Sequence, residues 1–316
     1  MQFSLEDNTE SNELDMVVED DTFVHFYHGP SKEMESVPAH VLFLFDTSMS
    51  QDKLTMGKEA FATLMNSLTD KDMFNLAFFN GNDGDKRSVQ YGQADTAVPI
   101  LCTQENAQKA VEFINNMESS GFNSSTNYIM EAINDNVALA AALSAAGSLP
   151  ANAVSRIVLL TDGRMANSEA ELDTKSIVMP LTIIGIGSDA NMAHLENILG
   201  DDDLIENVIE DAPVEHQLDA VVKHLHDVIL KDLEFRYLDQ AGEVIPVTHH
   251  QFKFLKRGSD IVISGQKDAG NMLQNLKAVE IKGQRASGQY SKKIAFLATP
   301  RHLGCIGNVL LFSSRC

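Results

Sequence analysis

The chain changes its pattern of apolar and polar positions near residue 230. Before that point, short runs of consecutive apolar residues alternate with stretches in which apolar residues recur at helical spacing. A strand that is apolar at every position is typically buried on both faces, as in a parallel sheet covered by helices. The pattern therefore predicts a three-layer α/β domain over residues 38–231, with a mostly parallel sheet between two layers of helices.

Within this domain the pattern predicts alternating strands and helices. The strands are expected at residues 41–45, 74–79, 88–91, 153–161, 181–186 and 204–208. The helices are expected at residues 54–68, 105–117, 127–146, 168–178, 192–199 and 213–230. The segment at 88–91 is short and polar, which is typical of an edge strand.

After residue 230 the apolar residues alternate in short segments separated by turns that contain Gly, Asp or Asn, which predicts an antiparallel β-sandwich module over residues 232–299. Residues 22–37 begin with a strand that has no partner inside the α/β domain, so we expect it to join this module. Residues 1–21 are acidic and lack a periodic apolar face, which favours a disordered lead-in. Residues 300–316 are expected to form an unrelated tail.

Polar side chains follow directly where the predicted strands end. Asp46, Ser48 and Ser50 come after the strand at 41–45, and Asp162 comes after the strand at 153–161. Ligands of open α/β sheets bind at the carboxyl ends of the strands. Thr126 begins a helix nearby, and carboxylate and hydroxyl oxygens are the ligands that Mg²⁺ prefers. We therefore expect a site for Mg²⁺, or for Mn²⁺ or Ca²⁺, while helix capping by Asp46, Ser48 and Ser50 is the plainer alternative.

Composition narrows the possible functions. The chain has 45 acidic against 24 basic residues and a net charge of -21, which argues against binding to nucleic acid or to anionic membranes. It contains no run of about 20 apolar residues, the length that a membrane-spanning helix needs. The first residues lack the basic start and apolar core of a signal peptide. No Ser, His and Asp set can be placed together, so we do not expect an enzyme.

Three segments together resemble the metal-ion-dependent adhesion site of von Willebrand factor type A domains. These are Asp46-x-Ser48-x-Ser50, the loop Ser124-Ser125-Thr126-Asn127, and Leu-Leu-Thr-Asp-Gly at 159–163. The resemblance implies that Ser48, Ser50 and Thr126 supply hydroxyls, while Asp46 and Asp162 hold the ion through water or at longer reach. It also implies a protein partner that completes the metal's shell with an acidic side chain.

The chain also resembles the inter-alpha-trypsin inhibitor heavy chain family over about residues 22–298. The resemblance is carried by Phe23-Val24-His25-Phe26, Asp72-Met73-Phe74-Asn75-Leu76, Ser125-Thr126-Asn127 and the segment at 252–259. It implies an extracellular protein of hyaluronan-rich matrix, associated with protease-inhibitor complexes. Met49 stands where the family has Gly, so we expect its side chain to reshape the tight loop. No Asp-Pro-His-Phe sequence is present, so covalent attachment to hyaluronan is not assigned.

Two other functions stay open: a structural domain whose metal site has decayed, and a metal-dependent hydrolase. Several further patterns favour plain structural roles. His224 and His226 lie two residues apart on a predicted helix and cannot face one ion, and Gly185-x-Gly187 is typical of a strand-end turn. Asn123-Ser124-Ser125 is a glycosylation sequon that matters only if the chain is exported.

Overall fold

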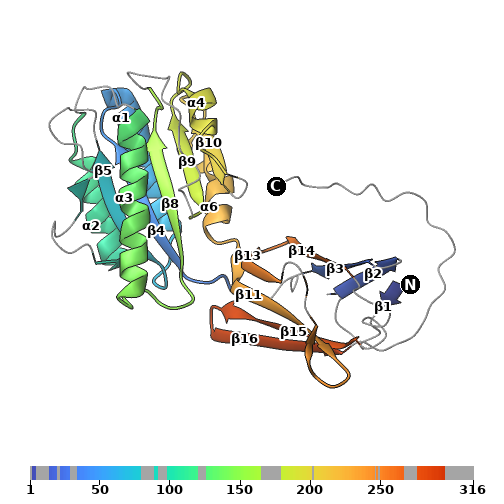
Figure 1. Cartoon of the computed structure of the whole chain (residues 1–316). Coiled ribbons are helices and arrows are strands. Elements are labelled where there is room, and N and C mark those ends of the chain that lie inside the picture. The colour runs from blue at the N-terminus through green and yellow to red at the C-terminus, as the bar shows by residue number, and fades with distance from the viewer. Residues whose placement is uncertain are drawn as a thin grey trace. The chain divides into compact units, whose positions relative to one another are not determined.

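A computed structural model describes most of the chain as two compact units. The described residues are 2–4, 14–19, 22–28, 34–79, 89–91, 98–119, 126–164, 179–200, 203–245, 247, 250–266 and 276–295. One unit is Val37–Asp227, and the other combines Met1–Ser36 with Val228–Cys316. We call them the α/β unit and the β module and describe each by itself (Figure 1).

The α/β unit is built on a sheet with β4 near its centre. Over the described residues the strand order is β10-β9-β8-β4-β5-β6, and β7 also pairs with β5. The strands from β10 to β5 run parallel, whereas β6 and β7 are antiparallel to β5. Their bounds are β4 Ala39–Asp46, β5 Met73–Phe79, β6 Val89–Gln90, β7 Ile100–Leu101, β8 Val154–Thr161, β9 Leu181–Ile186 and β10 Leu204–Val208.

Helices cover both faces of this sheet. Along β4, Val41, Phe43 and Phe45 face one apolar core, while Leu42 and Leu44 face the other. The first core is closed by α1 (Gln51–Ser67), α2 (Gln104–Asn115), α5 (Val214–Gln217) and α6 (Asp219–Leu225). The second is closed by α3 (Thr126–Ala145), which crosses the front of the sheet in Figure 1, and by α4 (Met192–Glu196). The predicted three-layer α/β fold is confirmed.

The β module consists of antiparallel strands in two sheets. One sheet has the order β1-β2-β3-β14, and the other has the order β12-β11-β15-β16 with β13 also paired to β11. Tyr27 and Ile263 of the first sheet share an apolar core with Phe235 and Val279 of the second. The bounds are β1 Gln2–Ser4, β2 Leu14–Glu19, β3 Thr22–His28, β11 Val228–Asp239, β12 Val244–Ile245, β13 Gln251–Lys256, β14 Asp260–Gln266, β15 Leu276–Arg285 and β16 Gly288–Ala295.

The structure differs from the sequence prediction mainly at two places, and it also has the short strand β7, which was not predicted. Within the expected disordered lead-in, β1 and β2 form strands, because β2 satisfies its backbone hydrogen bonds along the edge of β3. The expected helix at 213–230 ends at Leu225, and β11 begins at Val228 because Ile229 and Leu230 are buried in the core of the β module. The predicted helix at 168–178, the sequon at Asn123 and the tail at 300–316 lie outside the described residues.

A search of the helices in the described part of the chain found none that combines the length and the apolar character needed to cross a bilayer.

Candidate metal site

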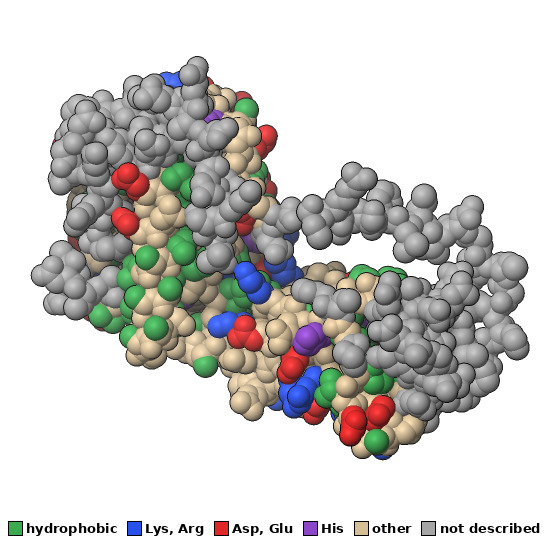
Figure 2. All heavy atoms as spheres, viewed as in Figure 1, with side chains coloured by type: hydrophobic (Ala, Val, Ile, Leu, Met, Phe, Trp, Pro, Cys, Tyr) green, Lys and Arg blue, Asp and Glu red, His purple; other side chains and the backbone are tan. Residues whose placement is uncertain are grey.

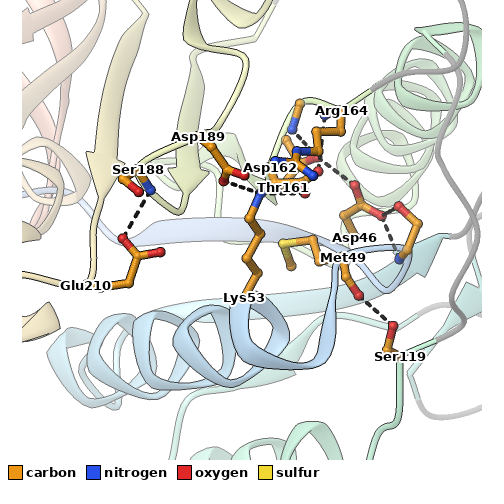
Figure 3. A network of polar contacts seen from close by, with 12 residues as sticks. Asp46, Met49, Lys53, Ser119, Thr161, Asp162, Arg164, Ser188, Asp189 and Glu210 are labelled. Atoms are coloured by element: carbon orange, nitrogen blue, oxygen red, sulfur yellow. Dashed lines mark hydrogen bonds and ion pairs between the residues drawn. The ribbon is translucent and has the colours of Figure 1, made fainter.

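Asp46 is the last residue of β4, and its side chain is fully buried at the carboxyl edge of the sheet. Its Oδ1 accepts hydrogen bonds from the Ser48 backbone N–H at 2.9 Å and from the Ser48 hydroxyl at 2.5 Å. Its Oδ2 accepts one from the hydroxyl of Thr161 at 2.6 Å. Thr161 ends β8, the parallel neighbour of β4, so both strands deliver polar groups to the same edge (Figure 3).

Burial raises the pKa of the Asp46 carboxyl above its usual value. The hydrogen bonds from Ser48 and Thr161 lower this pKa, and the nearby negative charge of Asp162 raises it again. The balance is a raised pKa, which means that the buried negative charge is incompletely compensated. Such a carboxylate favours a proton or a cation beside it.

Asp162 follows β8 directly, and only 4% of its surface is exposed. Its Oδ1 accepts a hydrogen bond from the Arg164 backbone N–H at 3.1 Å, and its backbone carbonyl accepts one from Asn191 at 2.9 Å. The turn needs Gly163, because its φ is +63° and a Cβ there would lie 2.9 Å from Leu195. Asp162 is therefore fixed at the strand end by backbone contacts.

The structure places the other expected ligands, Ser48, Ser50 and Thr126, in different surroundings or leaves their side chains undescribed. Ser48 contacts Asp46 as described above. Ser50 is exposed in the same loop, at the N-cap of α1, where its side chain makes no capping hydrogen bond. Thr126 is the first residue of α3, but its side chain lies outside the described part of the structure.

Met49 does not place its side chain among these polar groups. It is 1% exposed and belongs to the apolar core beneath the loop. A Cβ on Gly57 of α1 would lie 3.2 Å from the Met49 Cε, so the missing side chain at Gly57 leaves room for Met49. The backbone carbonyl of Met49 accepts a hydrogen bond from the Ser119 hydroxyl at 2.5 Å. The Met49 side chain is thus accommodated beside α1, and the expected reshaping of the loop stays a prediction.

Lys53 is the site residue that the sequence reasoning missed. Its Nζ donates to Asp162 Oδ2 at 3.0 Å and lies 2.5 Å from Asp189 Oδ1, which also pairs with Arg164 (Figure 3). Lys53 is 7% exposed and lies on the buried face of α1, beside Leu54. A charged residue on an otherwise apolar helical face is the sequence signal that identifies it.

The donor set suits a hard divalent cation. Among the residues whose side chains are described, no group of three or more His, Cys, Asp or Glu is placed to hold a metal ion. The expected set instead combines two carboxylates with three hydroxyls. Of these, the Ser48 hydroxyl lies on the buried Asp46, and Asp162 is near enough to raise the pKa of Asp46. Such oxygen ligands fit Mg²⁺, Mn²⁺ or Ca²⁺.

Comparison with known proteins supports the three-layer α/β fold described above. The sequence profile of the von Willebrand factor type A domain matches residues 40–222, which is more than half of the chain. A solved structure, von Willebrand factor type A from Catenulispora acidiphila, superposes with a TM-score of 0.50 and 16% identity, covering 89% of this chain and 70% of that one. This likeness shows a shared fold.

Curated relatives extend the similarity beyond the α/β unit. Inter alpha-trypsin inhibitor, heavy chain 4, of Mus musculus is 27% identical over 261 residues, which cover 79% of this chain and 26% of that protein. Inter-alpha-trypsin inhibitor heavy chain H3 of Homo sapiens is 24% identical over 276 residues, which cover 84% of this chain and 29% of that protein. The chain thus spans less than a third of the length of these relatives.

Proposed function

Because this chain belongs to the von Willebrand factor type A domain family and is distantly related to inter-alpha-trypsin inhibitor heavy chains, we propose that it is a binding protein whose contact with its partner depends on a divalent cation. The cation is Mg²⁺, with Mn²⁺ and Ca²⁺ as alternatives. Asp46, Ser48, Ser50, Thr126 and Asp162 would hold it.

One observation carries this proposal: the buried Asp46 carboxylate lies at the carboxyl edge of the sheet, with the Ser48 hydroxyl on it and Asp162 close by. A buried carboxylate whose pKa is raised by burial and by a nearby carboxylate is costly without a cation beside it. A hydroxyl that donates a hydrogen bond to a carboxylate directs its oxygen lone pairs toward other groups, which suits coordination of a metal ion. The arrangement therefore supports a site that gains stability from binding a metal ion.

The partner that we propose is a protein with an exposed Asp or Glu. A bound Mg²⁺ would offer a coordination position to that carboxylate, while the side chains of this chain would hold the ion and exclude other ligands. By relationship to the heavy chains, we also propose an extracellular setting with hyaluronan-rich matrix or a protease-inhibitor complex. We propose binding rather than catalysis, because membership of the von Willebrand factor type A domain family and the relationship to the heavy chains favour a binding domain.

The structure also favours one alternative, a structural domain that binds no metal. The ion pair between Lys53 and Asp162 already places a positive charge at one expected ligand. In this alternative the Lys53 ammonium takes the place of a metal ion beside Asp162, and the α/β unit contacts its partners without a metal ion.

Calorimetric titration with Mg²⁺ and with Mn²⁺ tests the proposal. We expect wild type to bind one ion and Asp46→Ala to bind it at least about tenfold more weakly, since a coordinating carboxylate is removed. Asp70→Ala removes an exposed carboxylate from the turn before β5 and should bind like wild type. No binding heat in wild type would contradict the proposal and favour the structural domain, and equal binding by Asp46→Ala would show that the ion binds at another site.

A further inference from the structure

Lys53 is a buried cation at the candidate site. Burial of an ammonium group is unfavourable unless carboxylates compensate it. Here the Nζ lies 3.0 Å from Asp162 Oδ2 and 2.5 Å from Asp189 Oδ1. Lys53 thus joins the loop after β8 to the loop after β9.

The loop after β9 is built around the stem of Lys53. Gly187 has a φ of +97°, and a Cβ at this position would lie 2.8 Å from the Lys53 Cε. A side chain at Gly187 would therefore push Lys53 away from Asp162. Arg164 pairs with the second oxygen of Asp189, so the same loop is held from two sides (Figure 3). The position of Lys53 is specified by its surroundings.

Without a metal ion, cations already offset part of the negative charge at this edge. Asp46, Asp162 and Asp189 contribute three carboxylates, the exposed Glu210 also interacts with Lys53, and Lys53 and Arg164 contribute two cations. A divalent cation held by Asp46 and Asp162 would share Asp162 with an ammonium group 3.0 Å from its Oδ2. Two cations at one carboxylate repel each other, and the effect is strong where the site is dry.

We propose that Lys53 is an internal counter-ion of this site, which neutralises Asp162 when no metal ion is bound and thereby weakens the binding of divalent cations. The inference rests on the proposed function, because it assigns a role to Lys53 in the same site. Lys53 is here a residue that tunes the affinity and does not contact the ion. The consequence is that the metal-free unit stays folded and that metal binding displaces or strains the Lys53 ion pairs.

Lys53→Met tests this role, because methionine keeps most of the stem length and removes the charge. We expect Mg²⁺ and Mn²⁺ to bind at least about tenfold more tightly than to wild type, since one repelling charge is lost. Without metal the melting temperature should fall, because Asp162 loses its counter-ion, and Mg²⁺ should raise it by more than in wild type. Lys53→Gln, which is also neutral but polar, should show the same changes and serves if Lys53→Met does not fold.

Lys58→Met is the matched control. Lys58 lies on the same helix, but its Nζ donates to the backbone carbonyls of Asn115 and Met117. Its removal changes the net charge equally and should leave metal affinity unchanged. Calorimetry and thermal melting with and without Mg²⁺ read out all the variants.

The outcomes separate this inference from the proposed function. If wild type and both Lys53 variants bind Mg²⁺ equally, or if Lys58→Met tightens binding as much as they do, the role of Lys53 is wrong and the proposed function stands. If only the Lys53 variants bind, Lys53 masks the site and the proposed function fails for wild type. If none of them binds, both are overturned.

Discussion

At the scale of single residues, the loop after β4 sends its polar and apolar side chains in opposite directions. Ser48 turns to the Asp46 carboxylate, while Met49 enters the core, where Gly57 leaves space for it. A large residue opposite a glycine is a complementary pair, and each determines what the other position tolerates. The candidate metal site and the core therefore meet within one loop.

A double-mutant cycle measures this complementarity. Met49→Ala should lower the free energy of unfolding by about 2–4 kcal/mol, because it opens a cavity in a packed core. Gly57→Ala alone should gain little, since a Cβ at 3.2 Å from both the Met49 Cε and the Phe45 Cζ offsets the better helix propensity of alanine. In the Met49→Ala background the same change should stabilise by at least about 1 kcal/mol. Urea unfolding measures all four proteins.

Additive effects within about 0.5 kcal/mol would contradict this pairing. Metal affinity provides an independent check, because a side chain in the core should leave it nearly unchanged. A large loss of Mg²⁺ binding in Met49→Ala would instead assign Met49 to the shape of the metal loop.

The residue scale also shows where sequence reasoning reaches its limit. Asp46 is evident from sequence, because a carboxylate follows five apolar residues without a break. Lys53 is less evident, because its partners Asp162 and Asp189 lie more than 100 residues away and depend on the strand order. A lysine near a helix start is usually exposed, so its burial is a consequence of tertiary structure.

At the scale of elements, the end of α6 is tied to the edge of the sheet opposite the candidate site. Arg156 of β8 donates to the backbone carbonyl of His224 and lies 3.6 Å from Asp227 Oδ1. His224 faces Asp227 at 3.2 Å, and His226 faces Asp72 at 3.3 Å. The two histidines therefore face different carboxylates and do not form a common metal site.

Arg156→Met should loosen this end of α6. The change removes the Arg156 cation, whose side chain is 2% exposed, from beside Asp227. Loss of one partner of a buried ion pair costs about 3–5 kcal/mol of stability. Hydrogen exchange should become faster in residues 219–227, whereas Mg²⁺ affinity should stay the same, because the site lies at the other edge. Exposed Lys223→Met is the control.

Unchanged exchange in α6 would show that apolar packing by Val221 and Leu225 alone holds the helix. A parallel loss of Mg²⁺ affinity would show coupling between the two edges of the sheet, contrary to the expectation.

The sequence predicts the ends of helices and strands well where an apolar run changes abruptly to polar residues, and less well where one apolar segment follows another. β4 ends at Asp46 and β8 ends directly before Asp162, and the change of polarity in the sequence predicts both ends. The sequence pattern predicts the end of α6 too late, because Leu225, Ile229 and Leu230 are all apolar although they belong to two different cores. Periodicity alone does not separate a helix from an apolar strand that follows it. β1 and β2 were missed because their stability comes from pairing.

At the scale of the whole molecule, charge is distributed unevenly. Residues 37–227 contain 28 acidic and 10 basic residues, whereas the β module, residues 1–36 and 228–316, contains 17 acidic and 14 basic residues. On the face drawn in Figure 2, Lys and Arg side chains of the β module lie beside Asp and Glu. In this module Arg236 and Lys282 both approach Glu280. The net negative charge that argues against polyanionic partners therefore lies mainly on the α/β unit, and only a small part of it lies on the β module.

Acid should destabilise the β module through His25. This residue is buried, its Nδ1 lies 2.5 Å from the Tyr237 hydroxyl, and burial, with a smaller effect of His28, lowers its pKa from 6.5 to about 3. Between these values the unfolded chain binds a proton that the folded module excludes. The free energy of unfolding should therefore fall as pH drops from 6.5 toward 3, by up to about 1.4 kcal/mol per pH unit.

His25→Gln should flatten this dependence, because glutamine does not titrate. Hydrogen exchange of residues 228–239 at several pH values measures the stability of the module directly. His216→Gln, at an exposed position of the α/β unit, should leave the slope unchanged. An equal slope in His25→Gln and wild type would assign the acid sensitivity to another group.

The pairing of β3 with β14 has a consequence for how the chain is made. His28 and Asp260 face each other across this pair but are separated by 232 positions in the sequence. At about 5–20 residues per second, a ribosome needs about 10–50 s to add the intervening segment. The α/β unit, whose contacts close within residues 37–227, is complete before β14 has been synthesised. During synthesis, β3 therefore lacks its partner β14 until the inserted α/β unit has been completed.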